Sequence, residues 1–255
     1  MDLNNKVVIV TGGASGLGLV TCQQLAKQGA KIVAFDLNEE AGQALVAELG
    51  EQAIFAKVNV TDEASVAAGI TKAMTAFGAI HVCINCAGIA PGGKTVGRNG
   101  ALALDKFAQV ININLIGTFN VLRLAAEQMA NNEPSEDGER GVIINTASVA
   151  AFDGQMGQAA YAASKAGVVG MTLPIARDLA RSGIRIMCIA PGIFDTPMMK
   201  GMTDEVRDPL IQMVQNPKRF GDPEEYAALA AHIINNNYLN GDVIRLDGAI
   251  RMEPK

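Results

Sequence analysis

The hydrophobic pattern of the chain alternates between short apolar runs and longer helical stretches. The apolar runs are rich in β-branched residues and show no regular polar position, as is typical of strands buried on both faces. Strands are predicted at residues 6–10, 31–36, 53–58, 81–85, 142–146, 184–189 and 243–246. Helices are predicted at residues 16–28, 39–49, 62–77, 103–130, 157–181 and 224–236.

This strand–helix alternation predicts an α/β fold. We expect a Rossmann-like, doubly wound parallel sheet of about seven strands, with right-handed crossovers and helices on both faces. No linker, repeat or low-complexity tract divides residues 1–255, so a single domain is predicted. Residues 132–140 are polar and acidic and contain Pro134, which predicts an exposed loop. Residues 191–222 form a long segment after the sixth strand, where such sheets place their substrates.

Composition excludes several classes of protein. Hydrophobic residues make up 49% of the chain, which is ample for a full core. The net charge of −5 argues against a nucleic-acid binder. No apolar run reaches the ~18 residues of a membrane helix, and the first residues resemble no targeting segment. Cys83-x-x-Cys86 has no second cysteine pair, so no metal or redox site is predicted, and the cysteines are expected to be reduced and buried.

A glycine-rich turn connects the first predicted strand to the first helix. Gly12 permits a tight turn, Gly16 lets the backbone approach a pyrophosphate, and Gly18 lets helix and strand pack closely. With Ser15 and Leu17, these residues place free N–H groups at a helix N-terminus, which favours an anion. The spacing is not that of the generic dinucleotide motif. A glycine-rich strand–helix connection without a ligand is therefore the alternative interpretation.

The end of the second strand indicates which dinucleotide binds. Asp36 lies 18 residues after Gly18, where a carboxylate accepts hydrogen bonds from ribose hydroxyls and repels a 2′-phosphate. Since neither Ser15 nor Leu37 supplies a cation, the sequence predicts NAD as the cofactor. Asp36 could instead cap the following helix. Asp62, after the third strand, either bonds the adenine edge or caps its own helix.

Tyr161 and Lys165 are four residues apart, so one helical face carries both. A phenol is mostly protonated at neutral pH, and a nearby ammonium stabilises the phenolate. Ser148, after the fifth strand, can hydrogen-bond a substrate oxygen, and Asn114 could hold a water that relays protons through Lys165. An isolated Tyr-x3-Lys pair is usually an ordinary helix face. Here the upstream phosphate turn and Ser148 favour acid–base chemistry on an alcohol.

These motifs resemble the short-chain dehydrogenase/reductase family, and they follow one another in the order typical of that family. The matching residues are 11–18, Asn85-Cys86-Ala87-Gly88, Asn114, Ser148 with Tyr161-x3-Lys165, and Pro191-Gly192. Cys86 departs from the usual Asn-Asn-Ala-Gly form, and we do not expect that change to affect catalysis. The resemblance implies an NAD-binding catalytic domain in which Tyr161 removes the hydroxyl proton as hydride leaves for the nicotinamide. It implies further cofactor contacts from Asn85, Ala87, Gly88, Tyr161, Lys165, Pro191, Gly192 and Thr196.

A narrower likeness links residues 141–152, 157–161, 171–179 and 240–252 to the type 2 3-hydroxyacyl-CoA dehydrogenases, also called 17β-hydroxysteroid dehydrogenase type 10. It implies a homotetramer of fatty acid metabolism that oxidises short or branched L-3-hydroxyacyl-CoA, with substrate contacts from Ser148, Gln155 and Tyr161. A dehydrogenase for steroids or other secondary alcohols, and an NAD-binding scaffold, are the alternatives. A cytoplasmic location is expected, and a mitochondrial matrix location stays open.

Two further segments each allow two interpretations. The basic residues of 92–99, Lys94 and Arg98, lie either in a solvated loop or at the CoA phosphates. The methionines after Pro191 form either an adaptable lid or core filler; they are Met198, Met199, Met202 and Met213.

Overall fold

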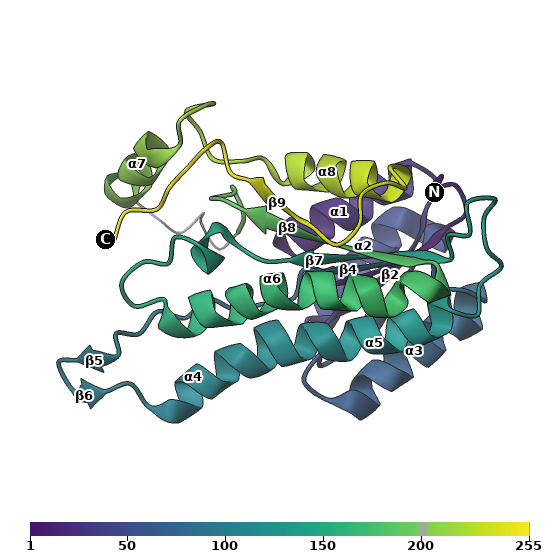
Figure 1. The fold of residues 1–255 in the computed structure, drawn as a ribbon, viewed down its shortest axis with the longest axis horizontal. Helices are drawn as coiled ribbons and strands as arrows, with labels where there is room; N and C mark the ends of the chain where they lie inside the picture. The colour runs from purple at the N-terminus through teal and green to yellow at the C-terminus, as the bar shows by residue number, and fades with distance from the viewer. Residues whose placement is uncertain (198, 200–202, 255) are drawn as a thin grey trace.

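A seven-stranded parallel sheet forms the centre of the molecule (Figure 1). The computed structural model describes residues 1–197, 199 and 203–254. The strands are β1 (Val7–Thr11), β2 (Lys31–Asp36), β3 (Ala53–Lys57), β4 (Val82–Asn85), β7 (Gly141–Thr146), β8 (Ile184–Pro191) and β9 (Val243–Leu246). Their order across the sheet is β3-β2-β1-β4-β7-β8-β9. The predicted Rossmann-like α/β sheet is therefore confirmed.

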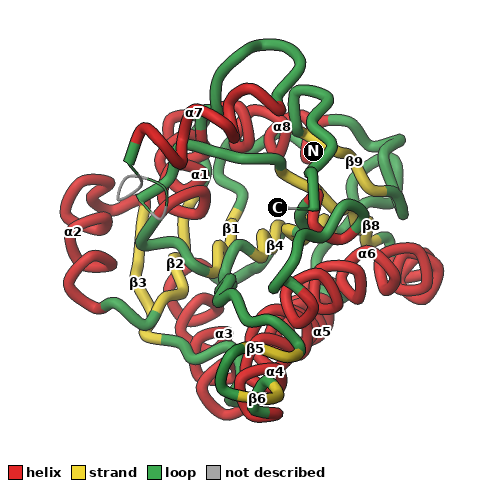
Figure 2. The backbone as a smooth tube through the Cα atoms, turned by 90° about the vertical axis from the view of Figure 1, so that its left-hand side faces the viewer, coloured by secondary structure: helices red, strands yellow, loops and turns green. Residues whose placement is uncertain are grey.

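Helices cover both faces of this sheet (Figure 2). One face packs against α1 (Gly16–Lys27), α2 (Glu39–Leu49) and α8 (Pro223–Asn235). The other packs against α3 (Glu63–Phe77), α5 (Gly117–Met129) and α6 (Ala159–Leu179). Along β1, Val8 and Val10 belong to the first core cluster, whereas Val7 and Ile9 belong to the second. Both sets are buried, which explains why the strands show no polar alternation.

The predicted long helix at 103–130 is built from three parts. They are α4 (Leu104–Ile111), a π-helical segment η2 (Asn112–Ile116) and α5. Short π segments inside helices are frequent at functional sites. This one carries Asn114, whose side chain is fully buried. The described residues also contain three short 3₁₀ segments: η1 (Gly50–Gln52), η3 (Val149–Ala151) and η4 (Ala180–Ser182).

Three segments differ from the sequence expectation. The long segment after β8 contains a helix, α7 (Asp204–Met213). Residues 92–101 contain a small antiparallel hairpin of β5 (Val96–Gly97) and β6 (Gly100–Ala101), which extends beside α4 (Figure 1). The loop at 132–140 is mostly exposed, but the prediction is wrong for Glu139, which is buried.

Burial of Glu139 is compensated by an ion pair with Arg185 of β8. Glu139 Oε1 accepts Nε–H of Arg185 at 2.7 Å, and the N-terminal ammonium lies 3.4 Å from Glu139 Oε2. The Arg185 guanidinium also donates to the carbonyl oxygens of Ile233 and Ile234, in the last turn of α8. These carbonyls lack partners within the helix, so Arg185 satisfies them and ties α8 to β8.

Among the helices that the structure describes, none is long and apolar enough to cross a membrane.

Candidate active site

A cavity of about 750 Å³ lies where the strands of the sheet end. Its wall takes residues that follow β1, β2, β3, β4, β7 and β8, as expected for a ligand crevice in an open α/β sheet. Most predicted site residues lie in this wall: Gly12, Ser15, Gly16, Leu17, Gly18, Asp36, Ala87, Gly88, Ser148, Gln155, Tyr161, Lys165, Pro191, Gly192 and Thr196. Asn85, Asp62 and Asn114 are not part of it.

The glycine-rich turn has the backbone geometry of a phosphate cradle. Gly12 and Gly16 have φ of +64° and +51°, in the left-handed region that favours glycine. Gly18 packs so closely that an added Cβ would lie 2.2 Å from the Gly12 carbonyl oxygen. The N-cap residue Ser15 makes no side-chain cap hydrogen bond, so the first N–H groups of α1 are left for a ligand.

Asp36 lies in the cavity wall at the end of β2. Its Oδ2 accepts the Ala14 N–H at 3.1 Å and its Oδ1 accepts the Asn38 N–H at 3.0 Å. The alternative role as a helix cap is wrong, because α2 is capped by Asn38, whose side chain accepts the Ala41 N–H. The carboxylate is thus held in place by one backbone donor on each oxygen, with lone pairs left to accept from hydroxyl groups.

Asp62 acts as a helix cap. Its Oδ1 accepts the N–H groups of Ala64 and Ser65, at 2.9 and 3.4 Å, at the start of α3. The part of the cavity wall after β3 is formed instead by Val58, Asn59 and Val60. Sequence reasoning missed these three residues, because nothing in their types distinguishes them from an ordinary strand end.

Helix α6 brings the predicted acid–base pair to the cavity. Lys165 is buried, and its Nζ donates to the Thr146 carbonyl oxygen at 2.7 Å and lies 5.8 Å from the centre of the Tyr161 ring. Ser148 follows β7 and its Oγ accepts the Ala150 N–H at 3.1 Å. Because that bond uses Oγ as an acceptor, the hydroxyl hydrogen is left to donate into the cavity. The three side chains therefore share one cavity with the glycine-rich turn.

Asn114 supports this arrangement from behind the wall. Its Nδ2 donates to the Ile89 carbonyl oxygen at 2.9 Å and to Ser164 Oγ at 3.0 Å, and its Oδ1 accepts the Ile89 N–H at 2.9 Å. A Cβ on Gly88 would lie 3.2 Å from Asn114 Oδ1 and 3.6 Å from Lys165 Nζ. The amide thus fixes the loop after β4 against α6. A water held by Asn114 stays a prediction.

Asn85 is directed into the sheet and not into the cavity. Its Nδ2 donates to Asn145 Oδ1 at 2.9 Å, and both side chains are buried. The cavity wall contains the next residue, Cys86, but not Asn85. The cofactor contact of Asn85 therefore stays a prediction.

Sequence reasoning also missed a polar cluster at the cavity, which includes the wall residues Thr146 and Cys86. Thr146 Oγ1 lies 2.7 Å from Tyr226 Oη, and Cys86 Sγ lies 3.6 Å from both hydroxyls. Burial raises the pKa of the Cys86 thiol, so the neutral form is favoured. Cys86 is half-buried while the other three cysteines are buried, and all four are free thiols. In the ranges that the structure describes, no three His, Cys, Asp or Glu side chains gather as a metal site would require.

The methionines after Pro191 divide between the two interpretations. Met199 lies in the cavity wall, and Met213 packs against the buried cluster of Val149, Val214 and Ile250. Met198 and Met202 lie outside the described residues.

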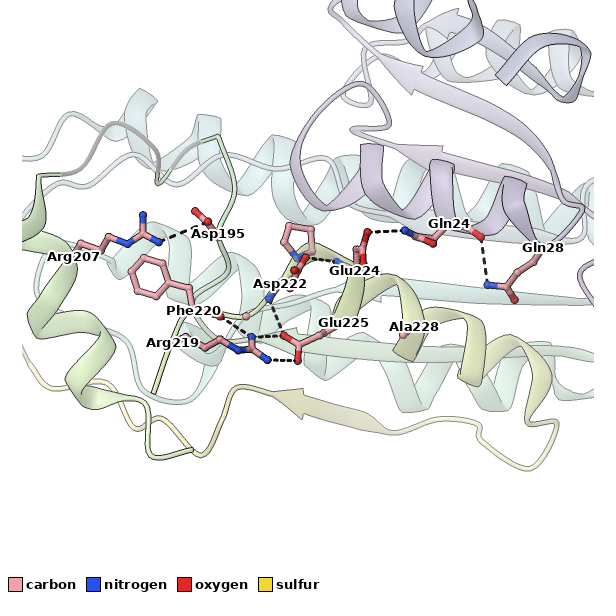
Figure 3. A pocket seen from close by; sticks show the side chains of 12 residues that line it. Gln24, Gln28, Asp195, Arg207, Arg219, Phe220, Asp222, Glu224, Glu225 and Ala228 are labelled. Carbon is pink, nitrogen blue, oxygen red and sulfur yellow. Dashed lines mark hydrogen bonds and ion pairs between the residues drawn. The ribbon is translucent and has the colours of Figure 1, made fainter. Parts of the chain in front are cut away.

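A second cavity, of about 840 Å³, lies between α1, α7 and α8 (Figure 3). The charged side chains of its wall bind one another: Arg219 donates to both carboxylate oxygens of Glu225 at 2.8 Å, and Arg207 lies 3.7 Å from Asp195. It contains none of Ser148, Tyr161 and Lys165. The chemistry therefore belongs to the smaller cavity.

The fold and this constellation agree with the comparisons to known proteins. Residues 6–207 match the family model for short chain dehydrogenases, and the chain belongs to that family. It is 56% identical over 255 residues to 3-hydroxyacyl-CoA dehydrogenase type-2 of Bos taurus, covering 99% of this chain and 98% of that protein. The corresponding Drosophila melanogaster protein is 54% identical, with 99% of this chain and 100% of that protein covered.

A solved structure shows the same relationship. The crystal structure of 3-hydroxyacyl-CoA dehydrogenase type-2 from Mycobacterium avium superposes with a TM-score of 0.94 at 42% sequence identity. The match covers 98% of this chain and 97% of that one.

Proposed function

We propose that this protein is an NAD-dependent oxidoreductase that oxidises the 3-hydroxyl group of short or branched L-3-hydroxyacyl-CoA, reversibly. The observation that carries the proposal is the shared cavity, in which Tyr161, Lys165 and Ser148 meet the glycine-rich turn. In this proposal residues 1–255 act as a single NAD-binding catalytic domain, with the substrate held by the segment at about 191–222.

The residues present fit a dinucleotide. An added Cβ on Gly16 would make only an ordinary van der Waals contact, 3.8 Å from the Thr196 side chain, so the glycine leaves the backbone accessible to a ligand beside the α1 N-terminus. Asp36 would hold the adenosine ribose and Lys165 the nicotinamide ribose. When bound, the nicotinamide ring supplies the hydride acceptor.

Side chains of the protein carry out the proton transfer. The phenolate of Tyr161 accepts the hydroxyl proton of the substrate, and the Lys165 ammonium stabilises that phenolate. The Ser148 hydroxyl donates to the substrate oxygen as carbonyl character develops on it. In the reverse direction the Tyr161 hydroxyl donates the proton to the carbonyl oxygen.

We propose NAD in preference to NADP, since Asp36 would face a 2′-phosphate and neither Ser15 nor Leu37 offers a cation to it. Asp36→Ala is expected to reduce the preference for NAD over NADP, measured as the ratio of kcat/KM values. Asp62→Ala is the matched control, because that carboxylate also follows a strand but caps α3 outside the cavity wall. An unchanged ratio in the Asp36 variant would remove this residue from cofactor selection.

The substrate class is tested by supplying NADH with either acetoacetyl-CoA or a steroid ketone. The oxidation of NADH is monitored by its absorbance. Val149, Ile193 and Met252 give the cavity wall near Ser148 an apolar lining, which suits a short acyl chain. Higher kcat/KM with acetoacetyl-CoA supports the proposal, and higher kcat/KM with the steroid favours the alternative. NAD binding with neither activity would leave the scaffold interpretation.

The proposed assembly is a homotetramer, and the proposed location is the cytoplasm, with the mitochondrial matrix as the second option. Four chains of 26.6 kDa each would give a particle of about four times that mass in light scattering. A monomer mass at micromolar concentration would contradict the tetramer.

A further inference from the structure

The C-terminal segment returns from β9 to the active-site cavity. Met252 lies in the cavity wall, and Ile250 is buried against Val149 and Val214. In Figure 1 the yellow segment that follows β9 runs to the same side of the molecule as α7. Residues 247–254, here called the C-terminal tail, therefore form part of the site although they follow the last strand.

The tail binds the loop that carries Gln155. The Met156 N–H donates to the Pro254 carbonyl oxygen at 3.0 Å. The Gln155 side chain, which also lies in the cavity wall, donates to the Glu253 carbonyl oxygen at 3.0 Å. These hydrogen bonds join two segments that lie about 100 positions apart in the sequence, so the position of each depends on the other.

Arg245, at the end of β9, links both segments to the sheet. Its guanidinium donates to Asp153 Oδ2 at 2.6 Å, to Asp247 Oδ2 at 2.7 Å and to the Ile250 carbonyl oxygen at 3.0 Å, and it lies over the Phe152 ring. The side chains of this group are largely buried, with exposed fractions of 21% for Arg245, 17% for Asp153 and 8% for Asp247. The hydrogen bond from Arg245 also lowers the pKa of Asp153, so the carboxylate stays charged.

We infer that Arg245 is a positioning residue for the substrate. By holding the loop of Gln155 and the tail of Met252 to the end of β9, it sets the shape of the cavity wall and hence the affinity for the acyl group. Arg245 itself is not part of the wall, and its contacts do not include the glycine-rich turn or Lys165. The inference rests on the proposed function for the identity of the substrate, but not for the link between the two segments.

Arg245→Gln is the first test, with Arg245→Lys as the conservative variant. We expect the KM for acetoacetyl-CoA to rise about tenfold in the glutamine variant, as for the loss of one charge-assisted hydrogen bond. The kcat and the dissociation constant of NADH should stay within about twofold, and the lysine variant should recover part of the affinity. Asp153→Asn removes the other partner of the Arg245–Asp153 ion pair and should give the same changes in KM, kcat and NADH affinity. This variant replaces Arg245→Gln as the test if Arg245→Gln folds poorly.

Arg251→Gln is the matched control. Arg251 lies in the tail and reaches Asp247, but its side chain is 65% exposed, and its hydrogen bonds go to Asp247 and Ile250 and not to the loop of Gln155. Its KM should stay within about twofold of the wild-type value. If both arginine variants raise the KM equally, the effect is one of charge and the inference fails.

Hydrogen exchange at the Met156 amide gives a readout that does not depend on the substrate. It should be faster in Arg245→Gln and unchanged in Arg251→Gln, because Arg245 bonds Asp153 of the loop and Arg251 does not. If acetoacetyl-CoA is not a substrate, the proposed function fails, and the KM of the ketone that is turned over must show the same rise. An unchanged KM, an equal loss of kcat and NADH affinity, or unaltered exchange at Met156 would overturn the inference.

Discussion

Replacement of Gly18 by alanine disturbs the cofactor half of the site through packing alone. The added Cβ would lie 2.2 Å from the Gly12 carbonyl oxygen, about 1.2 Å short of an ordinary contact of 3.4 Å. Because the obstacle is backbone, the first turn of α1 must move away from β1 by about that distance, and its N–H groups move with it. Overpacking of this kind costs about 1–3 kcal/mol of unfolding free energy. In a chain of this length that lowers Tm by about 2–12 °C.

Thermal unfolding and an NADH titration by fluorescence measure the two effects of Gly18→Ala. We expect the lower Tm together with a rise of about tenfold or more in the dissociation constant of NADH, since the amide donors leave the phosphate position. Gly170→Ala is the matched control, because an added Cβ there meets nothing within 4 Å. It should leave NADH binding unchanged and preserve or raise stability by about 0.5–1 kcal/mol. A Gly18 variant with wild-type Tm and wild-type NADH affinity would refute the reasoning.

Two further predictions concern stability. Burial, with a smaller contribution from the Lys6 ammonium, lowers the pKa of His81 from 6.5 to about 4, and its Nδ1 accepts the Val7 N–H. The unfolded chain therefore takes up the proton first as pH falls, so stability that is present above pH 6.5 is lost towards pH 4. His81→Asn should make the urea midpoint less dependent on pH between these values. An equal drop of the midpoint in the wild-type protein and the variant would contradict this prediction. Glu139→Ala should lower the unfolding free energy by about 3–5 kcal/mol in urea, because it leaves the buried Arg185 charge unpaired; a loss below about 1 kcal/mol would show that the pair contributes little.

Most of the fold could be predicted because its signals are local. Each buried strand appears as a short apolar run, and each helix follows after a turn, so the seven strands and their covering helices were found within a few residues. α7 was missed because Asp204–Met213 contains Pro209 and half of its residues are polar, which favours a loop. The hairpin of β5 and β6 was missed because its strands have two residues each and contain glycine.

In the candidate site, too, short local motifs could be predicted from the sequence. The glycine-rich turn and the Tyr161–Lys165 pair are short motifs whose spacing carries the chemistry, so their residues could be chosen from the sequence. The contacts between distant segments could not. Lys165 is anchored by the backbone carbonyl of Thr146, which has no side-chain signature, and Arg245 meets Asp153 across 92 positions.

The central claim is that the Tyr161 hydroxyl transfers the proton in a cavity that also binds the dinucleotide. Tyr161→Phe removes that oxygen and little else, so turnover of acetoacetyl-CoA should fall by a factor of about 10²–10⁴. The dissociation constant of NADH should stay nearly unchanged, because the phosphate turn and Asp36 are untouched. A Tyr161→Phe protein that keeps wild-type turnover would contradict the account.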